Sequence, residues 1–235
     1  MYNDKKKRKG VMQMERKESH MLWNNLMEHM IEDHCPVCSL MKDRTHSAMD
    51  NFLYECANLP DIRLKIKKEG GFCERHSKEL LLLGDPLAHA IIYQDLFDEA
   101  LKNLNSSKIK ISLFNKKEEN QCFFCTREKK GEEHYTKAIA EAVSDQEFLL
   151  KYKESGMLCL PHLKMVLSMK ARNPEKVQQM KEATLKKYDS MLGSLKEIMR
   201  KHDFHFKNEP LTEKEKEDWK KAVTIFHGLE KDATT

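Results

Sequence analysis

Two copies of one cysteine and histidine pattern constrain this chain more than any other feature. A Cys-x-x-Cys pair is followed by Cys-x-x-His after 34 residues in the first copy and after 33 residues in the second. Three thiolates and one imidazole are the donor set of a closed, tetrahedral structural zinc site, with no position left for water. The eight predicted metal ligands are Cys35, Cys38, Cys73, His76, Cys122, Cys125, Cys159 and His162.

The same cysteines also fit other chemistry, which the sequence context weakens. A thioredoxin-type redox pair needs a βαβ context, and this chain has helical patterns instead. The compact cysteine runs of ferredoxins are absent, yet spacing alone does not exclude an iron–sulfur cluster with one histidine ligand. We therefore expect two zinc ions per chain, with iron–sulfur or thiol redox and electron-transfer chemistry as the alternative.

The pairing of the ligands stays open at the level of sequence. A duplicated unit would most simply close within each copy, so that Cys35 and Cys38 share an ion with the Cys-x-x-His that follows them. Exchange of halves between the copies is also compatible with the same eight ligands, because the entropic cost of closing a loop rises only slowly with its length.

The two copies match beyond their ligands. Asp85-Pro86 and Asn173-Pro174 follow the two Cys-x-x-His motifs, and both are typical of a helix cap followed by proline at the first helical position. Apolar residues recur at helical spacing, namely Met49, Leu53 and Ala57 in the first copy and Tyr135, Ile139 and Val143 in the second. We expect an all-α, pseudo-symmetric helical bundle of two tandem repeats, each stapled by a Cys3His site.

Longer amphipathic helices are expected at the end of each copy and at the end of the chain. Their apolar positions are Leu87, Ile91, Leu101 and Leu104 in the first copy, and Val177, Met180, Leu195 and Ile198 in the second. A final helix is predicted to begin at Thr212, where Glu215 completes a capping box, and to bury Trp219, Val223 and Phe226. The predicted organisation is a basic tail (1–18), repeat 1 (19–104), an extended linker (105–121), repeat 2 (122–205) and a C-terminal helix (206–235).

Composition limits where the protein works and what it binds. With 40% hydrophobic and 34% charged residues, the chain is typical of a helix-rich globular protein. No apolar run approaches membrane-spanning length and no secretory signal is recognisable, so we expect a cytoplasmic protein without membrane contact. In that reducing compartment, seven cysteines favour metal or thiol chemistry over disulfides. The net charge of +4 resides in residues 1–18, so nucleic acid is an expected partner only through that tail.

The odd cysteine and the other histidines are not predicted to be ligands. Cys56 aligns with Ala142 of the second copy and His34 with Gln121, which favours a small helix residue and a non-ligand histidine. The remaining histidines on predicted helices, His46, His89 and His134, are interpreted as surface or core residues. No glycine-rich phosphate loop or nucleophilic serine elbow occurs, so no catalytic residue is predicted.

The motif-bearing segments resemble an uncharacterised bacterial family, common in anaerobes, whose members carry CPxC … GFCxxH twice. The matching segments are Cys35 to Cys38, Gly71 to His76, Cys122 to Cys125 and Leu158 to His162. The second copy departs from the pattern at Phe123, in place of the proline, and at Met157-Leu158, in place of Gly-Phe. The resemblance implies a helical metal-binding protein. With the closed donor sets, it leads us to expect a non-enzymatic interaction or regulatory module with an unidentified protein partner.

Overall fold

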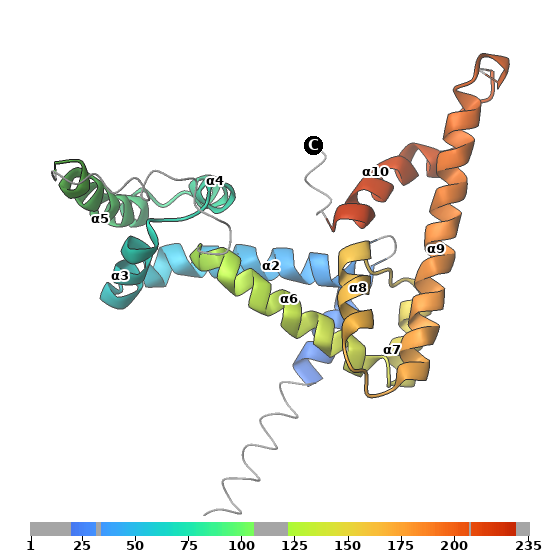
Figure 1. The fold of residues 1–235 in the computed structure, drawn as a ribbon, viewed down its shortest axis with the longest axis horizontal. Coiled ribbons are helices and arrows are strands. Elements are labelled where there is room, and N and C mark those ends of the chain that lie inside the picture. The colour runs from blue at the N-terminus through green and yellow to red at the C-terminus, as the bar shows by residue number, and fades with distance from the viewer. Residues whose placement is uncertain (1–19, 32–33, 106–121, 207, 229–235) are drawn as a thin grey trace, which may run out of the picture. The chain divides into compact units, whose positions relative to one another are not determined.

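The computed structural model describes residues 20–31, 34–105, 122–206 and 208–228, and all regular structure in these ranges is helical (Figure 1). The elements are a helix over 20–28, α2 (Pro36–Asn51), the π-helix η1 (Phe52–Cys56), α3 (Pro60–Glu69), α4 (Glu74–Leu83), α5 (Pro86–Asn105), α6 (Phe123–Ala142), α7 (Gln146–Glu154), α8 (Leu160–Ser168), α9 (Pro174–Lys201), the 3-10 helix η4 (Phe204–Phe206) and α10 (Glu213–His227). The prediction of an all-α protein is confirmed.

The helix starts follow the capping residues expected from the sequence. The side chains of Asp85 and Asn173 each accept a hydrogen bond from the backbone N–H three residues later, at 3.0 and 3.2 Å. Thr212 and Glu215 form the predicted capping box at the start of α10. Each of these bonds satisfies a backbone donor that the first helical turn leaves without an intrahelical partner.

Tertiary contacts divide the chain into two compact units. One unit contains the described residues up to Leu40 and from Glu133 onward, and the other unit is Met41–Glu132. Both boundaries fall inside helices, so α2 and α6 each contribute one end to each unit. The compact units are therefore not the two stretches of sequence that carry the repeated motif.

The Met41–Glu132 unit has an aromatic core. η1 continues α2 without a break and buries Phe52, whose ring makes edge contacts with Phe72 and Phe124 at centroid distances of 5.7 and 5.4 Å. The expected stripe of Met49, Leu53 and Ala57 is buried in the same core. Such edge-to-face ring pairs stabilise a core beyond the area that they bury.

The predicted apolar face of α5 is wrong in part. Leu87, Leu101 and Leu104 are 68%, 54% and 48% exposed, whereas Ala88 and Ile92 are buried. The helix is therefore rotated so that small and β-branched side chains face the core. The three leucines lie at the surface because the opposite side of α5 packs against η1 and α3.

In the other unit, α9 is a 28-residue helix that packs against α7 and α10, and α10 also packs on α8. Its core contains the fully buried Phe148, Leu149 and Tyr152 of α7, together with the expected Ile139 of α6 and Val143, which directly follows α6. Phe148 and Leu149 precede Tyr152 by four and three residues, as expected for one helix face.

The predicted buried face of α10 is wrong. Trp219, Val223 and Phe226 are 50%, 44% and 61% exposed, whereas Glu215, Asp218 and Ile225 are buried. Glu215 forms an ion pair with Lys201 of α9 at 2.7 Å. This pair turns a partly polar face of α10 toward α9, which a rule based on apolar spacing does not anticipate.

Two predicted segments lie outside the described residues, namely the basic tail (1–18) and almost all of the linker (105–121), of which only Asn105 is described. Among the helices that the structure describes, none is both long and apolar enough to cross a membrane.

Candidate metal centres

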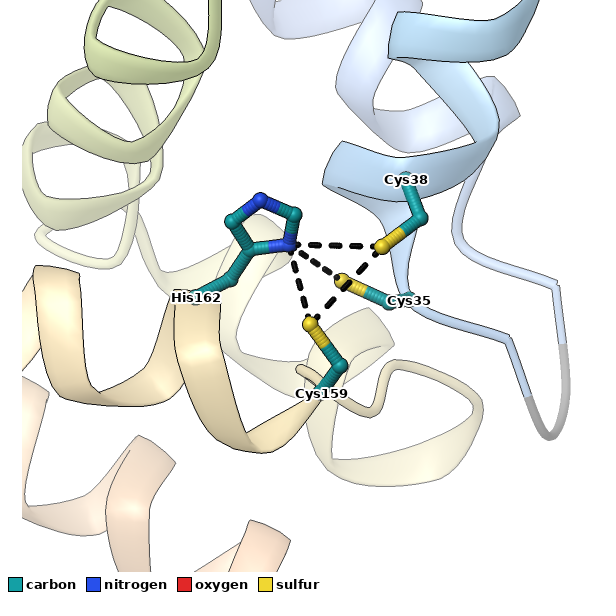
Figure 2. A group of neighbouring side chains, drawn as sticks. All are labelled: Cys35, Cys38, Cys159 and His162. Atoms are coloured by element: carbon teal, nitrogen blue, oxygen red, sulfur yellow. Dashed lines mark hydrogen bonds between the residues drawn. The ribbon is translucent and has the colours of Figure 1, made fainter. Parts of the chain in front are cut away.

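Site 1 is a group of four side chains from two distant parts of the chain: Cys35, Cys38, Cys159 and His162. The first pair lies at the start of α2, while Cys159 caps α8 and His162 lies in its first turn. The three sulfur atoms lie 3.0–3.4 Å from Nδ1 of His162, and the Sγ atoms of Cys38 and Cys159 are 3.7 Å apart. Figure 2 shows all four donor atoms turned toward one point.

Site 2 repeats this arrangement in the Met41–Glu132 unit with Cys73, His76, Cys122 and Cys125. Cys73 caps α4, His76 lies in its first turn, and the other two thiols flank the start of α6. Nδ1 of His76 lies 3.2–3.4 Å from the three sulfur atoms, and the Sγ atoms of Cys73 and Cys125 are 3.7 Å apart. Each group is arranged to hold a metal ion.

The structure thus gathers all eight predicted ligands, but it pairs them between the copies. The simplest expectation, closure within each copy, is wrong, because each Cys-x-x-Cys shares its site with the Cys-x-x-His of the other copy. The physical reason is that α2 belongs to both compact units. This helix begins beside site 1, but from Met41 onward its residues belong to the other compact unit, which also contains Cys73.

Comparison with known proteins identifies relatives of this chain. A model for a family of unknown function, DUF6062, matches residues 24–232. The chain belongs to this family. It is also 33% identical over 208 residues to an uncharacterised 23.9 kDa protein encoded in the xynA 3′ region of Caldicellulosiruptor sp. (strain Rt8B.4), covering 87% of this chain and 100% of that protein. No solved structure matches.

In each site one thiol loses its proton more easily than usual and a neighbouring thiol less easily. At site 2, burial alone would raise the pKa of Cys122, but hydrogen bonds from His76 and from backbone amides outweigh burial and lower this pKa to about 6. Burial and the neighbouring Cys73 raise the pKa of Cys125 to about 12. Without a cation, one thiolate therefore suppresses ionisation of its neighbour. A metal ion removes this conflict and releases protons on binding.

Site 1 shows the same contrast. Burial opposes ionisation of Cys35, but hydrogen bonds from Cys159, Cys38 and His162 hold its pKa well below the usual range. Hydrogen bonding to Cys159 and then to Cys35 raises the pKa of Cys38. Both sites are thus poised to accept a cation that neutralises several thiolates at once.

Two tyrosines support site 1, and the sequence analysis did not identify them. The buried N–H of Leu158 donates to the hydroxyl of Tyr152 at 3.0 Å, and the C=O of Leu158 accepts from the hydroxyl of Tyr188 at 2.7 Å. Leu158 directly precedes the ligand Cys159, so both hydrogen bonds fix the turn that presents this thiol. In the sequence Tyr152 is one more apolar position of a helix, so no motif signalled this role.

The C-terminal end of α10 also contacts site 1. The Sγ of Cys38 lies 3.6 Å from the carbonyl oxygen of Gly228, which ends α10 with a φ of 69°. A Cβ at this position would lie 3.3 Å from the sulfur of Cys159. Glycine therefore satisfies both the left-handed helix end and the close approach to a ligand.

The residues that were not predicted to bind metal lie outside both sites. Cys56 packs against the aromatic core, and it is absent from both groups, as are His34, His46, His89 and His134. The sequence analysis missed Glu128, whose carboxylate lies beside His76. The sequence shows Glu128 three residues after Cys125, but it does not show that His76, 52 residues earlier in the chain, is its partner.

Proposed function

We propose that the protein is a cytoplasmic zinc-binding protein whose two Cys3His sites staple its helices, and that it works as a non-enzymatic interaction or regulatory module. The observation that carries this proposal is the geometry of the donor atoms. For a tetrahedral ion with Zn–S bonds of about 2.3 Å, the sulfur atoms lie about 3.8 Å apart. The Cys38–Cys159 sulfur pair of site 1 and the Cys73–Cys125 pair of site 2, both at 3.7 Å, match this value.

The compactness of the donor sets favours a single ion over a cluster. In an iron–sulfur cluster the four ligands are divided among two or four iron atoms, which moves some of their donor atoms apart. Here all four donor atoms of each site lie within 4.8 Å of one another. This supports one ion in each site, and three sulfurs with one imidazole nitrogen suit zinc.

A structural role is supported by closure of both sites. Four protein ligands complete a tetrahedral shell, so no coordination position remains at which a substrate could be activated. His76, Cys122 and Cys159 are fully or almost fully buried, which separates the donor atoms from solvent. Zinc binding would then contribute directly to folding, because each site joins helices that are far apart in sequence.

Interaction with a protein partner is supported by apolar side chains at the surface of the Met41–Glu132 unit. Leu81 and Leu82 of α4 are 71% and 87% exposed, and Phe97 of α5 is 66% exposed. Exposed apolar groups of this size are common at protein interfaces. A cytoplasmic setting is supported by the free thiols of all seven cysteines, each of which the structure describes.

Metal analysis of protein purified without oxygen tests the proposal. We expect colourless protein with two zinc ions per chain, and Cys56→Ser, which replaces the only cysteine outside the sites, should keep both. Cys38→Ser should lose the ion of site 1. Brown protein that contains iron and absorbs visible light would instead favour a redox or electron-transfer role, the second candidate, which the sulfur-rich donor sets also permit.

A further inference from the structure

The histidine of site 2 uses its two ring nitrogens in different ways. Nδ1 of His76 faces the three sulfur atoms, at 3.2–3.4 Å. Nε2 points to the other side of the ring and lies 3.2 Å from Oε2 of Glu128. The His76 side chain is fully buried. Among the described residues Nε2 has no hydrogen-bond partner of good geometry, and the Glu128 carboxylate is the charged group that lies beside it.

Glu128 is itself held in place from two further helices. Arg75 of α4 approaches both carboxylate oxygens, with Nη1 donating to Oε1 at 3.1 Å and Nη2 contacting Oε2. Thr45 of α2 donates to Oε1 at 3.3 Å. A carboxylate bound by a guanidinium fork and a hydroxyl has little freedom to leave the imidazole.

The sequence of site 1 differs from that of site 2 at the two positions that hold Glu128 and Arg75. The residue three positions after Cys38 is Met41, where site 2 has Glu128 after Cys125. The residue before His162 is Pro161, where site 2 has Arg75 before His76. The two donor sets are chemically the same, and the residues at these two positions differ.

We propose that Glu128 is a positioning residue for the metal ion of site 2, and that it makes this site retain its metal more tightly than the same donor set would without it. The inference rests on the proposed metal-binding function. A carboxylate at Nε2 keeps the proton on that nitrogen, fixes the ring plane and makes Nδ1 a better donor. Loss of such a partner typically lowers metal affinity by about 10–100-fold.

Metal release from the zinc-loaded full chain tests this role. Excess chromophoric chelator should remove the two ions with separate rate constants. Glu128→Gln keeps the shape of the side chain and removes its charge, so it should raise the rate of one release step by roughly 10–100-fold and leave the other unchanged. Glu79→Gln is the matched control, because Glu79 contacts Arg75 at 3.5 Å without touching the imidazole, and it should leave both steps unchanged.

Nuclear magnetic resonance of the histidine ring nitrogens gives a readout that a general loss of stability would not produce. In the zinc-loaded protein, the Nε2 proton of His76 should be shifted downfield and protected from exchange, and Glu128→Gln should move it upfield. If Glu128→Gln does not fold, Arg75→Gln, which loosens the carboxylate without removing it, should accelerate the same release step.

Release of both ions at the wild-type rate in Glu128→Gln, or equal acceleration of both, would overturn the role of Glu128. These results differ from failure of the proposed function itself. In that case the wild-type protein would contain no zinc, whereas here it would contain two zinc ions whose release does not depend on Glu128.

Discussion

Tyr152→Phe removes one hydroxyl from a chain of hydrogen bonds whose direction is fixed. Thr184 donates to the carbonyl of Met180 at 3.0 Å, so it accepts from Tyr152 at 2.7 Å. The Tyr152 oxygen in turn accepts from the N–H of Leu158 at 3.0 Å. Tyr152 is fully buried, and burial is the largest influence that raises the pKa of its hydroxyl, which stays protonated.

The size of the stability loss follows from the two groups that lose a hydrogen-bond partner, the N–H of Leu158 and the hydroxyl of Thr184. A buried N–H without a partner costs about 1–3 kcal/mol, and the lost bond to Thr184 adds about 1 kcal/mol. The free energy of unfolding should therefore fall by about 2–4 kcal/mol. For a chain of this size, about 1 kcal/mol corresponds to 2–4 °C in Tm, so the variant should melt roughly 5–15 °C lower.

Thermal unfolding of the metal-loaded protein, followed by circular dichroism, measures this effect. Tyr54→Phe is the control, because the Tyr54 side chain is 83% exposed and its hydroxyl should contribute less than about 0.5 kcal/mol. Since Leu158 precedes Cys159, Tyr152→Phe should also accelerate metal release from site 1. A Tm within about 1 °C of the wild-type value would refute the assigned hydrogen-bond chain.

Three further outcomes follow from the core, from α10 and from the metal. Phe124→Ala, which removes a ring with 1% exposure from beside site 2, should cost about 3–5 kcal/mol in denaturant titration, and a loss below about 1 kcal/mol would contradict the packing. Lys201 lowers the pKa of Glu215, so the Glu215 charge stabilises the folded state above the usual glutamate range, and this contribution is lost as the pH falls through the lowered pKa. The stability gap between wild type and Glu215→Gln, which retains the capping hydrogen bond, should be present at pH 7 and vanish in acid; a gap that persists in acid would exclude this ion pair as its cause. Complete metal removal should lower both Tm and helical content, whereas identical melting of metal-free and metal-loaded protein would show that neither site stabilises the fold.

The sequence predicts the helices and their caps well because these depend on local chemistry. Asn173 and Thr212 cap the helices that they precede, as their side chains and the following residues indicate. The rotation of a helix about its axis depends on distant partners instead. Trp219 is exposed on α10 because the ion pair of Glu215 with Lys201 helps to set which face meets α9, and Lys201 is 14 residues away.

The candidate site shows the same division between local and long-range information. The repeated spacing identifies each ligand, but it is nearly equal in both copies and so carries no information on which halves combine. Pairing depends on where α2 and α6 deliver their ends. The role of Glu128 could not be predicted from the sequence for the same reason. It depends on the packing of α4 and α6, which brings His76 beside the carboxylate.

The exchanged pairing is tested most directly by counting tightly bound metal ions in two double variants, using native mass spectrometry after a chelator wash. Cys38→Ser with Cys159→Ser removes two thiols from site 1 and should leave one ion per chain, at site 2. Cys38→Ser with Cys73→Ser removes one thiol from each site and should leave none. The reverse result, no ion in the first variant and one in the second, would contradict the exchange and establish closure within each copy.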